Sequence, residues 1–394
     1  MTNETADIVV IGAGAAGTSI AWQLARRGAG KVVLLEKHGL ASGGTGWSSA
    51  LIRQHYTHEV LARMALASLR VFERFEEIVG APADFQQCGF LVLVKPEDVE
   101  PLKANVAMHQ RIGIESSVLS AAEVAQLEPR IFTEDIVAAS WEPKSGYADP
   151  VAATNGYAEA AKRHGAEIRI GVTVESLVAG PNGIEGVQTD QGTIATNTVV
   201  VAAGFRTREL VQPLGIDLPI TPIRHDIGIV ARTPDFGPRH PVISDRINGS
   251  YFRPEGADMT LIGTTAAYDG HEDPDVERTR EPWDDDTETL VKRFWNRFPT
   301  QENATLRSGY TGVYDCSPDL QPLLGPIDEI PGLHVAAGFS GHGFKLSPVV
   351  GELIAEKIID GQTTLVDIGF FSPRRFLDSR EITSARAYSV GTLG

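Results

Sequence analysis

Residues 7–17 read Asp-Ile-Val-Val-Ile-Gly-Ala-Gly-Ala-Ala-Gly, an apolar run that leads straight into a Gly-x-Gly-x-x-Gly pattern. A helical pattern of apolar residues follows, at Ile20, Ala21, Leu24 and Ala25. A second apolar run, Lys31–Leu35, then ends on Glu36. A buried strand, a glycine turn, a helix and a second strand ending on an acidic residue together form the Rossmann fingerprint of a dinucleotide site.

Each part of this fingerprint has a physical role. Gly12 permits the tight turn, Gly14 lets a pyrophosphate approach the backbone, and Gly17 lets the helix pack on the strand. The helix N-terminus favours the negative charge. Glu36 can accept hydrogen bonds from both hydroxyls of an adenosine ribose and repels a 2′-phosphate, which disfavours NADP. The alternative is a glycine-rich turn in another α/β fold, and the terminal Glu36 argues against it.

Composition narrows the class of protein. The chain has 394 residues, which suggests about two domains, and 42% hydrophobic residues, enough for substantial cores. The formal net charge of -16 and a pI near 5.1 disfavour a nucleic-acid partner, because such a face needs clustered Lys and Arg. We therefore expect a soluble globular protein without a nucleic-acid partner.

The N-terminus and the cysteines indicate a location. Residues 1–7 carry no basic side chain, and glycine cuts short the apolar run at 8–11, so we expect neither a signal peptide nor a membrane span. Cys88 and Cys316 are too few for a disulfide framework and too far apart for a zinc motif. The expected location is the cytoplasm.

Local patterns predict several further elements. Apolar spacing over 59–79 predicts one long amphipathic helix, and Cys88–Val94 is typical of a strand. Val174–Ala179 and Gly183–Thr189 are predicted as two strands around a turn. The acidic run 284–286 fits a solvated helix N-terminus better than a metal site.

A second glycine-rich motif lies far along the chain. Residues 338–348 read Gly-Phe-Ser-Gly-His-Gly-Phe-Lys-Leu-Ser-Pro and set a histidine and a lysine in one turn. Together with the N-terminal fingerprint, Ile52-Arg53, Thr198–Gly204 and Gly351-Glu352, this motif resembles the FAD-dependent amine and amino-acid oxidoreductases of the D-amino-acid oxidase superfamily. The resemblance is greatest to the sarcosine oxidase and dehydrogenase branch, which includes monomeric sarcosine oxidase and the β subunit of the heterotetrameric enzyme, and it covers nearly the whole chain.

The resemblance implies an α/β fold with a Rossmann-type FAD-binding domain and a mixed α+β substrate domain that is inserted twice and built on an antiparallel sheet. The FAD-binding domain is expected in three pieces, 1–85, 150–215 and 322–370. The substrate domain is expected at 86–149 and 216–321, and the C-terminal tail at 371–394.

The same resemblance implies a carboxylate pocket. In monomeric sarcosine oxidases an arginine and a lysine hold the substrate carboxylate, and the matching motifs place Arg53 and Lys345 at those positions and Tyr314 beside them. Arginine offers a planar fork and lysine a compact second charge. Two alternatives stay open: Arg53 as an exposed helix-entry residue, and Lys345 as a charge that serves the flavin alone.

Histidines carry less information. His342 lies where the relatives place a histidine near the flavin, so it is expected to tune the ring or orient substrate, with a structural role as the alternative. The other nine histidines have no such context. His55 and His58 are three apart, but no acidic or cysteine partner is close in sequence, so we expect surface or capping roles and no metal site.

Departures from the family pattern bear on flavin attachment. The cysteine that tethers flavin in monomeric sarcosine oxidases falls on Gly312, with Cys316 four residues further on, and the FMN-bearing histidine of the heterotetrameric enzymes falls on Ala148. We therefore expect one FAD, bound without a covalent link.

Two further departures bear on the electron acceptor. The lysine credited with activating oxygen in the monomeric oxidases aligns with Leu261, and a nearby histidine with Thr265. A missing cation beside the flavin slows superoxide formation, because the developing negative charge is less stabilised. This favours a dehydrogenase over an oxidase, with oxygen or another carrier as acceptor.

Cofactor contacts are expected from both glycine motifs and the segments that flank them. The residues are Gly12, Ala13, Gly14, Ala15, Ala16, Gly17, Glu36, Lys37, Thr45, Ser48, Ser49, Val174, Ala203, Gly204, Gly338, Gly341, His342, Gly343, Phe344 and Lys345.

The expected reaction is oxidation of the C–N bond of a small secondary or N-methylated amino acid, sarcosine-like, by hydride transfer to flavin N5, giving an imine that hydrolyses. Tyr251, Tyr314 and Phe344 are candidate pocket walls, with core packing as the alternative for each aromatic ring. The alternatives are a D-amino acid, a proline derivative or an aminophosphonate as substrate, or a flavin-bearing subunit that is inactive alone. A homo-oligomer or a hetero-oligomer is compatible with the sequence.

Overall fold

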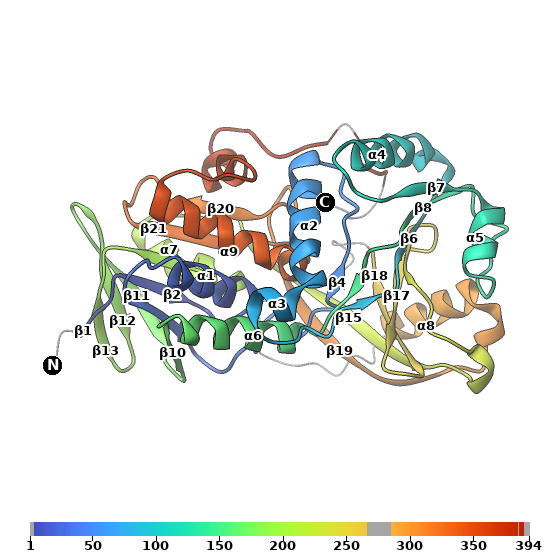
Figure 1. The fold of residues 1–394 in the computed structure, drawn as a ribbon, viewed down its shortest axis with the longest axis horizontal. Coiled ribbons are helices and arrows are strands. Elements are labelled where there is room, and N and C mark those ends of the chain that lie inside the picture. The colour runs from blue at the N-terminus through green and yellow to red at the C-terminus, as the bar shows by residue number, and fades with distance from the viewer. Residues whose placement is uncertain (1–3, 266–284, 385, 390–394) are drawn as a thin grey trace.

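The computed structural model describes residues 4–265, 285–384 and 386–389. Figure 1 shows an elongated molecule with one layered α/β region around α1, α6 and α9 and a second region around a larger sheet. No helix in the described part of the chain has both the length and the apolar composition needed to span a membrane.

A six-stranded sheet forms the centre of the first region. From edge to edge its strands are β10 (Glu167–Ile170), β3 (Val32–Glu36), β2 (Ile8–Ile11), β14 (Val199–Val201), β21 (Leu333–Ala337) and β20 (Leu323–Pro326). All neighbours pair in parallel except β20 and β21. The two apolar runs predicted as Rossmann strands are therefore neighbours, β2 and β3.

This sheet is buried on both faces, which explains its continuous Val, Ile and Leu runs. Val10 and Leu34 face the helix layer, whereas Val9 and Val33 face a smaller sheet. The helix layer consists of α1 (Ala15–Arg26), α6 (Pro150–Arg163) and α9 (Gly343–Asp360). The smaller sheet consists of β1 (Glu4–Thr5), β13 (Gly192–Ala195), β12 (Gly183–Thr189) and β11 (Val174–Gly180). The predicted hairpin is confirmed, because β11 and β12 pair antiparallel.

The second region is built on an eight-stranded sheet. Its strands in order are β19 (Thr305–Cys316), β15 (Thr221–Ala231), β18 (Met259–Thr264), β17 (Ser250–Glu255), β16 (Val242–Asp245), β6 (Phe90–Val94), β8 (Ala138–Glu142) and β7 (Ser117–Leu119). Only the pair of β16 and β6 is parallel. The fold is thus the expected Rossmann-type α/β fold with a second, mainly antiparallel sheet. The domain boundaries drawn from the sequence remain a prediction.

One face of this sheet packs on α8 (Asp285–Arg297) and α5 (Ala121–Leu127) through Leu91, Ile243, Phe252 and Phe294. The opposite face meets α4 (Val99–Arg111) at one end and carries Ile227, Tyr251 and Leu261 at the other. The acidic run 284–286 lies outside the residues whose side chains the structure describes.

The connecting segments correct one prediction. The helix expected over 59–79 is two helices, α2 (Glu59–Glu73) and α3 (Phe75–Val79), separated at Arg74. Arg74 has φ -127° and ψ 30°, outside the helical range, and the break lets the Phe75 ring pack against Tyr157 of α6, with 5.0 Å between ring centroids. Packing between layers overrides the local helical pattern.

Smaller elements complete the chain. A three-stranded sheet joins β4 (Leu51–Ile52), β9 (Gly146–Tyr147) and β5 (Gln86–Gln87), and α7 (Thr207–Val211) follows β14. Short 3-10 helices span 96–98, 204–206, 212–214, 234–236, 299–301, 368–371 and 373–376. The tail is held by Arg375, which is buried and pairs with Asp319 at 2.8 Å.

Candidate active site

The N-terminal glycine turn is packed so closely that side chains are excluded from it. Gly12 has φ +100°, and a Cβ atom there would lie 2.5 Å from the carbonyl oxygen of Ala202. A Cβ atom on Gly17 would lie 1.9 Å from the carbonyl oxygen of Gly12. At Gly14 the nearest atom is Thr45 Oγ1, at 3.1 Å. Gly12 and Gly17 are therefore required by the protein's own backbone packing, whereas a Cβ atom on Gly14 would make a tight contact with one side chain, that of Thr45.

Glu36 closes this turn from the end of β3. Its Oε2 accepts a hydrogen bond from Ala13 N at 2.8 Å, and its Oε1 accepts one from His38 N at 2.8 Å. Thr45 Oγ1 accepts from Ala15 N at 3.1 Å, while Gly14, the N-cap of α1, makes no side-chain cap. Glu36 thus sits at the mouth of the glycine turn, where the expected ribose contact requires it.

The second glycine turn lies between β21 and α9. Gly338, Ser340 and Gly341 have φ values of +67°, +50° and +88°, so the chain reverses sharply before α9 begins at Gly343. Asp315 fixes the turn by accepting from Gly338 N at 2.8 Å. Burial raises the pKa of Asp315 to about 6. The turn brings the start of α9 up to the large sheet.

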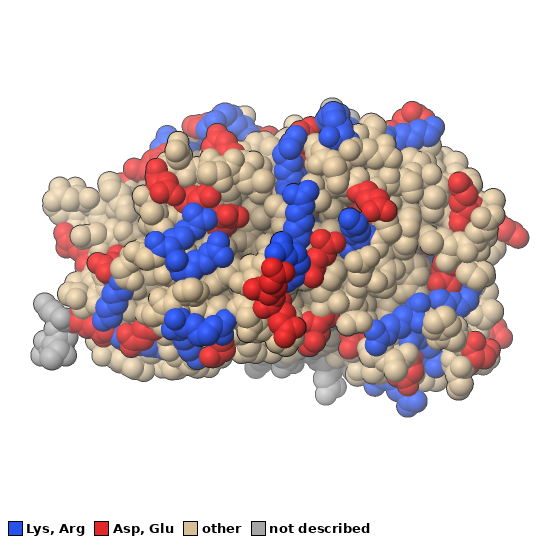
Figure 2. Space-filling view, in the orientation of Figure 1, with Lys and Arg blue, Asp and Glu red and all other residues tan. Residues whose placement is uncertain are grey.

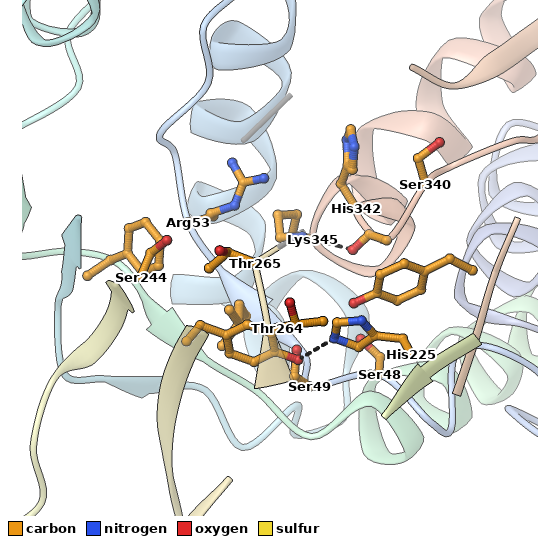
Figure 3. A pocket seen from close by; sticks show the side chains of 15 residues that line it. Ser48, Ser49, Arg53, His225, Ser244, Thr264, Thr265, Ser340, His342 and Lys345 are labelled. Atoms are coloured by element: carbon orange, nitrogen blue, oxygen red, sulfur yellow. Dashed lines mark hydrogen bonds between the residues drawn. The ribbon is translucent and has the colours of Figure 1, made fainter. Parts of the chain in front are cut away.

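A cavity lies between this turn and the large sheet, and Figure 3 shows the side chains that surround it. The described residues lining it are Ser48, Ser49, Leu51, Arg53, Phe90, His225, Ser244, Tyr251, Thr264, Thr265, Tyr314, Ser340, Gly341, His342 and Lys345. None of these is Asp or Glu. The cavity therefore favours an anionic or neutral ligand over a cation.

Two cationic side chains enter the cavity from different elements. Arg53 follows β4, is 7% exposed, donates to the carbonyl oxygen of His55, and stacks its guanidinium 4.3 Å from the ring centroid of Tyr56. Lys345 lies in the first turn of α9, is 6% exposed and donates to Gly341 O at 3.4 Å. Burial and the Arg53 charge hold the pKa of Lys345 well below its usual range. A bound anion would relieve both effects.

His342 lies beside this pair. It is 2% exposed. Burial, Lys345 and Arg53 hold its pKa well below the usual range, so the imidazole is neutral at pH 7. Arg53 and Lys345 thus share a cavity whose described lining includes no acidic side chain, and His342 adds a neutral polar ring.

An aromatic stack forms the wall on the side of the sheet. His225 of β15 lies between Tyr314 of β19, with 4.6 Å between ring centroids, and Tyr251 of β17, at 6.0 Å. Its Nε2 lies 3.3 Å from Tyr251 Oη. Burial lowers the pKa of His225 to about 4. His225 is not predicted as a site residue, because its strand carries no sequence motif and only the pairing of β15 with β19 brings it to the cavity.

The predicted site residues divide into two groups. Arg53, Tyr314, His342 and Lys345 meet at the cavity, together with Ser48, Ser49 and Gly341 of the cofactor list. The fingerprint residues lie at the first glycine turn, and Ala203 and Gly204 follow β14 nearby. Phe344 is not among the described lining residues: its ring packs on Phe72, with 5.4 Å between ring centroids, so the core-packing alternative holds for this residue.

The structure also shows where the residues that depart from the family pattern lie. Leu261 is buried against Ile227 and Tyr251, whereas Thr265 lines the cavity. Gly312 faces Trp47, with 3.2 Å from its ideal Cβ position to the Trp47 Cβ atom. Cys316 is 3% exposed, and burial raises the pKa of its thiol to about 12.

His55 and His58 lie in different surroundings. His58 caps α2 by accepting from Val60 N at 3.3 Å, as predicted. His55 is fully buried, so its predicted surface or capping role is wrong. It lies 3.6 Å from Glu142, with His109 close by, and this carboxylate could not be found from local sequence. Arg53 and Arg246 add positive charge to this group.

A family model described as FAD dependent oxidoreductase matches residues 7–357. The chain belongs to this family. The first glycine turn fits the cofactor, because a Cβ atom on Gly12 or Gly17 would collide with backbone and one on Gly14 would crowd Thr45 at the start of α1. Glu36, with Lys37 behind it, and Thr45 at the helix start would hold the nucleotide end. The second glycine turn and Lys345 would meet the ring end.

Individual relatives are dehydrogenases and oxidases of amino acids. Rat mitochondrial dimethylglycine dehydrogenase is 28% identical over 95% of this chain and 45% of its own length. Human mitochondrial sarcosine dehydrogenase is 28% identical over 95% and 42%. The 4-methylaminobutanoate oxidase of Paenarthrobacter nicotinovorans is 27% identical over 92% and 45%. The chain thus spans less than half the length of these relatives.

Solved structures match the whole chain more evenly. L-proline dehydrogenase from P. horikoshii superposes with a TM-score of 0.89 at 30% identity, over 96% of this chain and 100% of that one. Glycine oxidase from Geobacillus kaustophilus gives 0.82 at 25% identity, over 95% and 99%.

Figure 2 shows acidic and basic side chains intermixed on one face of the molecule, without a continuous basic surface.

Proposed function

We propose that this chain oxidises the C–N bond of a small secondary or N-methylated amino acid and releases an imine that water hydrolyses. The observation that carries the proposal is the pairing of Arg53 and Lys345 in a buried cavity whose described lining residues include no acid. FAD, when bound, accepts the hydride.

The substrate carboxylate is the natural counter-ion of this pair. The Arg53 fork gives two parallel hydrogen bonds, and the stack on Tyr56 fixes the plane of the guanidinium. Lys345 supplies a second charge, whose protonated form the carboxylate stabilises. Together they fix one end of the substrate and so set the direction in which its amine points.

The amine end meets neutral groups. Tyr251 and Tyr314 keep their protons, because burial raises both pKa values, and His225 is neutral at pH 7. No acidic side chain among the described lining residues would stabilise a protonated amine. The amine therefore binds in its neutral form, in which the nitrogen lone pair can assist loss of hydride from the adjacent carbon.

The similar proteins support this substrate class. The names of three of them specify dimethylglycine, sarcosine and proline, each a carboxylate with a secondary or tertiary amine. A fourth acts on 4-methylaminobutanoate, in which more carbon atoms separate the amine and the carboxylate. We propose a dehydrogenase rather than an oxidase, since buried Leu261 supplies no cation for oxygen activation.

The test is anaerobic reduction of the purified FAD-bound protein, followed by the loss of flavin absorbance. Sarcosine, other N-methyl amino acids, proline, D-amino acids and an aminophosphonate are added singly. Bleaching by secondary or N-methylated amino acids is the expected result, and readmitted air should restore the colour slowly. Bleaching by D-amino acids alone would overturn the substrate class. A well-bound FAD that no amine reduces would indicate a subunit that needs a partner chain.

A further inference from the structure

Arg246 points toward the same side of the large sheet as the cavity. Its N–H donates to Leu93 O at 3.1 Å, so the chain continues the ladder of β16 for one more residue. Asp245 faces the other side, where its Oδ2 accepts from Arg297 Nε of α8 at 2.8 Å. Since strand side chains alternate, Arg246 shares the face of Ser244, which lines the cavity, although Arg246 itself is not among the described lining residues.

The Arg246 guanidinium is buried, and the described residues offer it no acceptor. The residue is 5% exposed, and Nε, Nη1 and Nη2 all lack a hydrogen-bond partner among the described residues. A buried guanidinium with no acceptor is costly, whereas hydrogen bonds to a carboxylate satisfy it. The charges of Arg246 and Arg53 act on a common neighbour, because both lower the pKa of His55.

The C-terminal segment covers Arg246. The Tyr388 ring stacks 4.5 Å from the guanidinium, and Tyr388 Oη lies 2.6 Å from His55 Nε2. Ser389 holds both oxygens of Asp98, with Ser389 N to Oδ1 at 2.7 Å and Ser389 Oγ to Oδ2 at 3.0 Å. The negative charge of Asp98 acts to raise the pKa of Arg246, but Asp98 makes no hydrogen bond to Arg246 in the described structure. The stack on Tyr388 fixes the plane of the Arg246 guanidinium, whose N–H groups have no acceptor among the described residues.

We propose that Arg246 binds a second carboxylate of the substrate, and that the chain therefore acts on amines with two acidic arms, N-(carboxyalkyl) amino acids. This inference rests on the proposed function, in which Arg53 and Lys345 hold the first carboxylate. The amine then lies between two arginine sites, and the second arm selects the substrate.

The probes are thioether acids, in which sulfur replaces the nitrogen so that nothing is oxidised. Thiodiacetate and 3-(carboxymethylthio)propanoate carry two carboxylates, and (methylthio)acetate and (propylthio)acetate are the single-acid controls. Dissociation constants are measured by calorimetry on the FAD-bound protein. We expect the better diacid to bind at least about tenfold more tightly than the better single acid, as a charge-assisted hydrogen bond implies.

Variants assign that preference. R246M should reduce the affinity ratio of diacid to single acid to about 1, and R246K should keep part of it. R253M is the matched control, because Arg253 is also buried and stacks on a tyrosine, 4.7 Å from Tyr147, yet it pairs with Glu255. R253M should keep the wild-type ratio.

The outcomes separate the two proposals. Equal affinity of the wild-type protein for diacid and single acid, or an unchanged ratio in R246M, would overturn the role of Arg246 and leave the proposed function standing. Failure of every thioether acid to bind would overturn the proposed function itself. If R246M does not fold, the wild-type ratio and R246K still decide.

Discussion

Lys345 Nζ donates to the carbonyl oxygen of Gly341, 3.4 Å away across the first turn of α9. Burial and the Arg53 charge lower the pKa of this ammonium, which means that the surroundings disfavour the protonated form. The long hydrogen bond to Gly341 offsets only part of this effect. Affinity for a single-acid ligand should therefore fall as pH rises through the pKa of Lys345, because the neutral amine no longer attracts the carboxylate.

That fall is measured by titrating (methylthio)acetate between about pH 6 and about pH 10 while following flavin absorbance. K345M should abolish the inflection and lower the affinity at pH 6 by roughly ten- to a hundredfold. K357M is the control, since Lys357 of the same helix also donates to a carbonyl, Gly361 O at 2.8 Å, but outside the cavity. An identical inflection in K345M would contradict the assignment.

Replacement of Arg53 tests the fork geometry. R53M should weaken (methylthio)acetate binding by roughly a hundredfold, and R53K should recover only part of it, because an ammonium cannot make two parallel hydrogen bonds. Dissociation constants and FAD content are measured together. R63M is the control, because exposed Arg63 lies on α2, away from the cavity, and pairs with Glu59. Full recovery in R53K would show that charge alone is required.

His225 should make the protein less stable in acid. Its folded pKa of about 4 lies below the usual 6.5, so between these values the unfolded chain binds a proton that the folded chain does not. The free energy of unfolding therefore falls as pH drops through this window, by roughly 3 kcal/mol in total. H225F keeps an aromatic ring between the two tyrosines and should lose less stability than wild type from pH 7 to pH 5.

Urea unfolding at the two pH values measures this difference. H164F, at an exposed histidine, should behave as wild type does. If H225F and wild type lose equal stability, the charge of His225 does not contribute to acid unfolding.

The glycines of the first turn should separate folding from cofactor binding. G17A forces a Cβ atom to within 1.9 Å of a backbone oxygen and should lower the yield of folded protein, whereas G14A meets only Thr45 Oγ1 at 3.1 Å and should fold. Because we propose that the pyrophosphate approaches the backbone at Gly14, G14A should bind FAD at least about tenfold more weakly. Melting temperature and the ratio of FAD to protein after dialysis report the two effects. G39A, where a Cβ atom meets nothing within 4 Å, is the control. A G14A protein that keeps FAD fully would contradict the predicted role of Gly14.

Local sequence predicts the parts of the site that belong to continuous motifs. The turn at 12–17 and the strand ends around it could be predicted, since β2, α1 and β3 are consecutive and their hydrophobic periods are clear. Arg53 and Lys345 could be paired only through the resemblance, because β4 and α9 lie almost at opposite ends of the chain. His225 and Arg246 could not be found, since each becomes significant only when the strand order of the large sheet is known.

The order of strands in the six-stranded sheet also constrains synthesis. β14 lies between β2 and β21, and α1 packs on α9, so the nucleotide-binding layer lacks one side until residues 333–360 have left the ribosome. The large sheet, whose last strand ends at Cys316, is complete earlier. The side of α1 that packs on α9 therefore has no partner while some three hundred residues are translated, and exposed apolar surface of this kind favours aggregation of a nascent chain unless chaperones cover it.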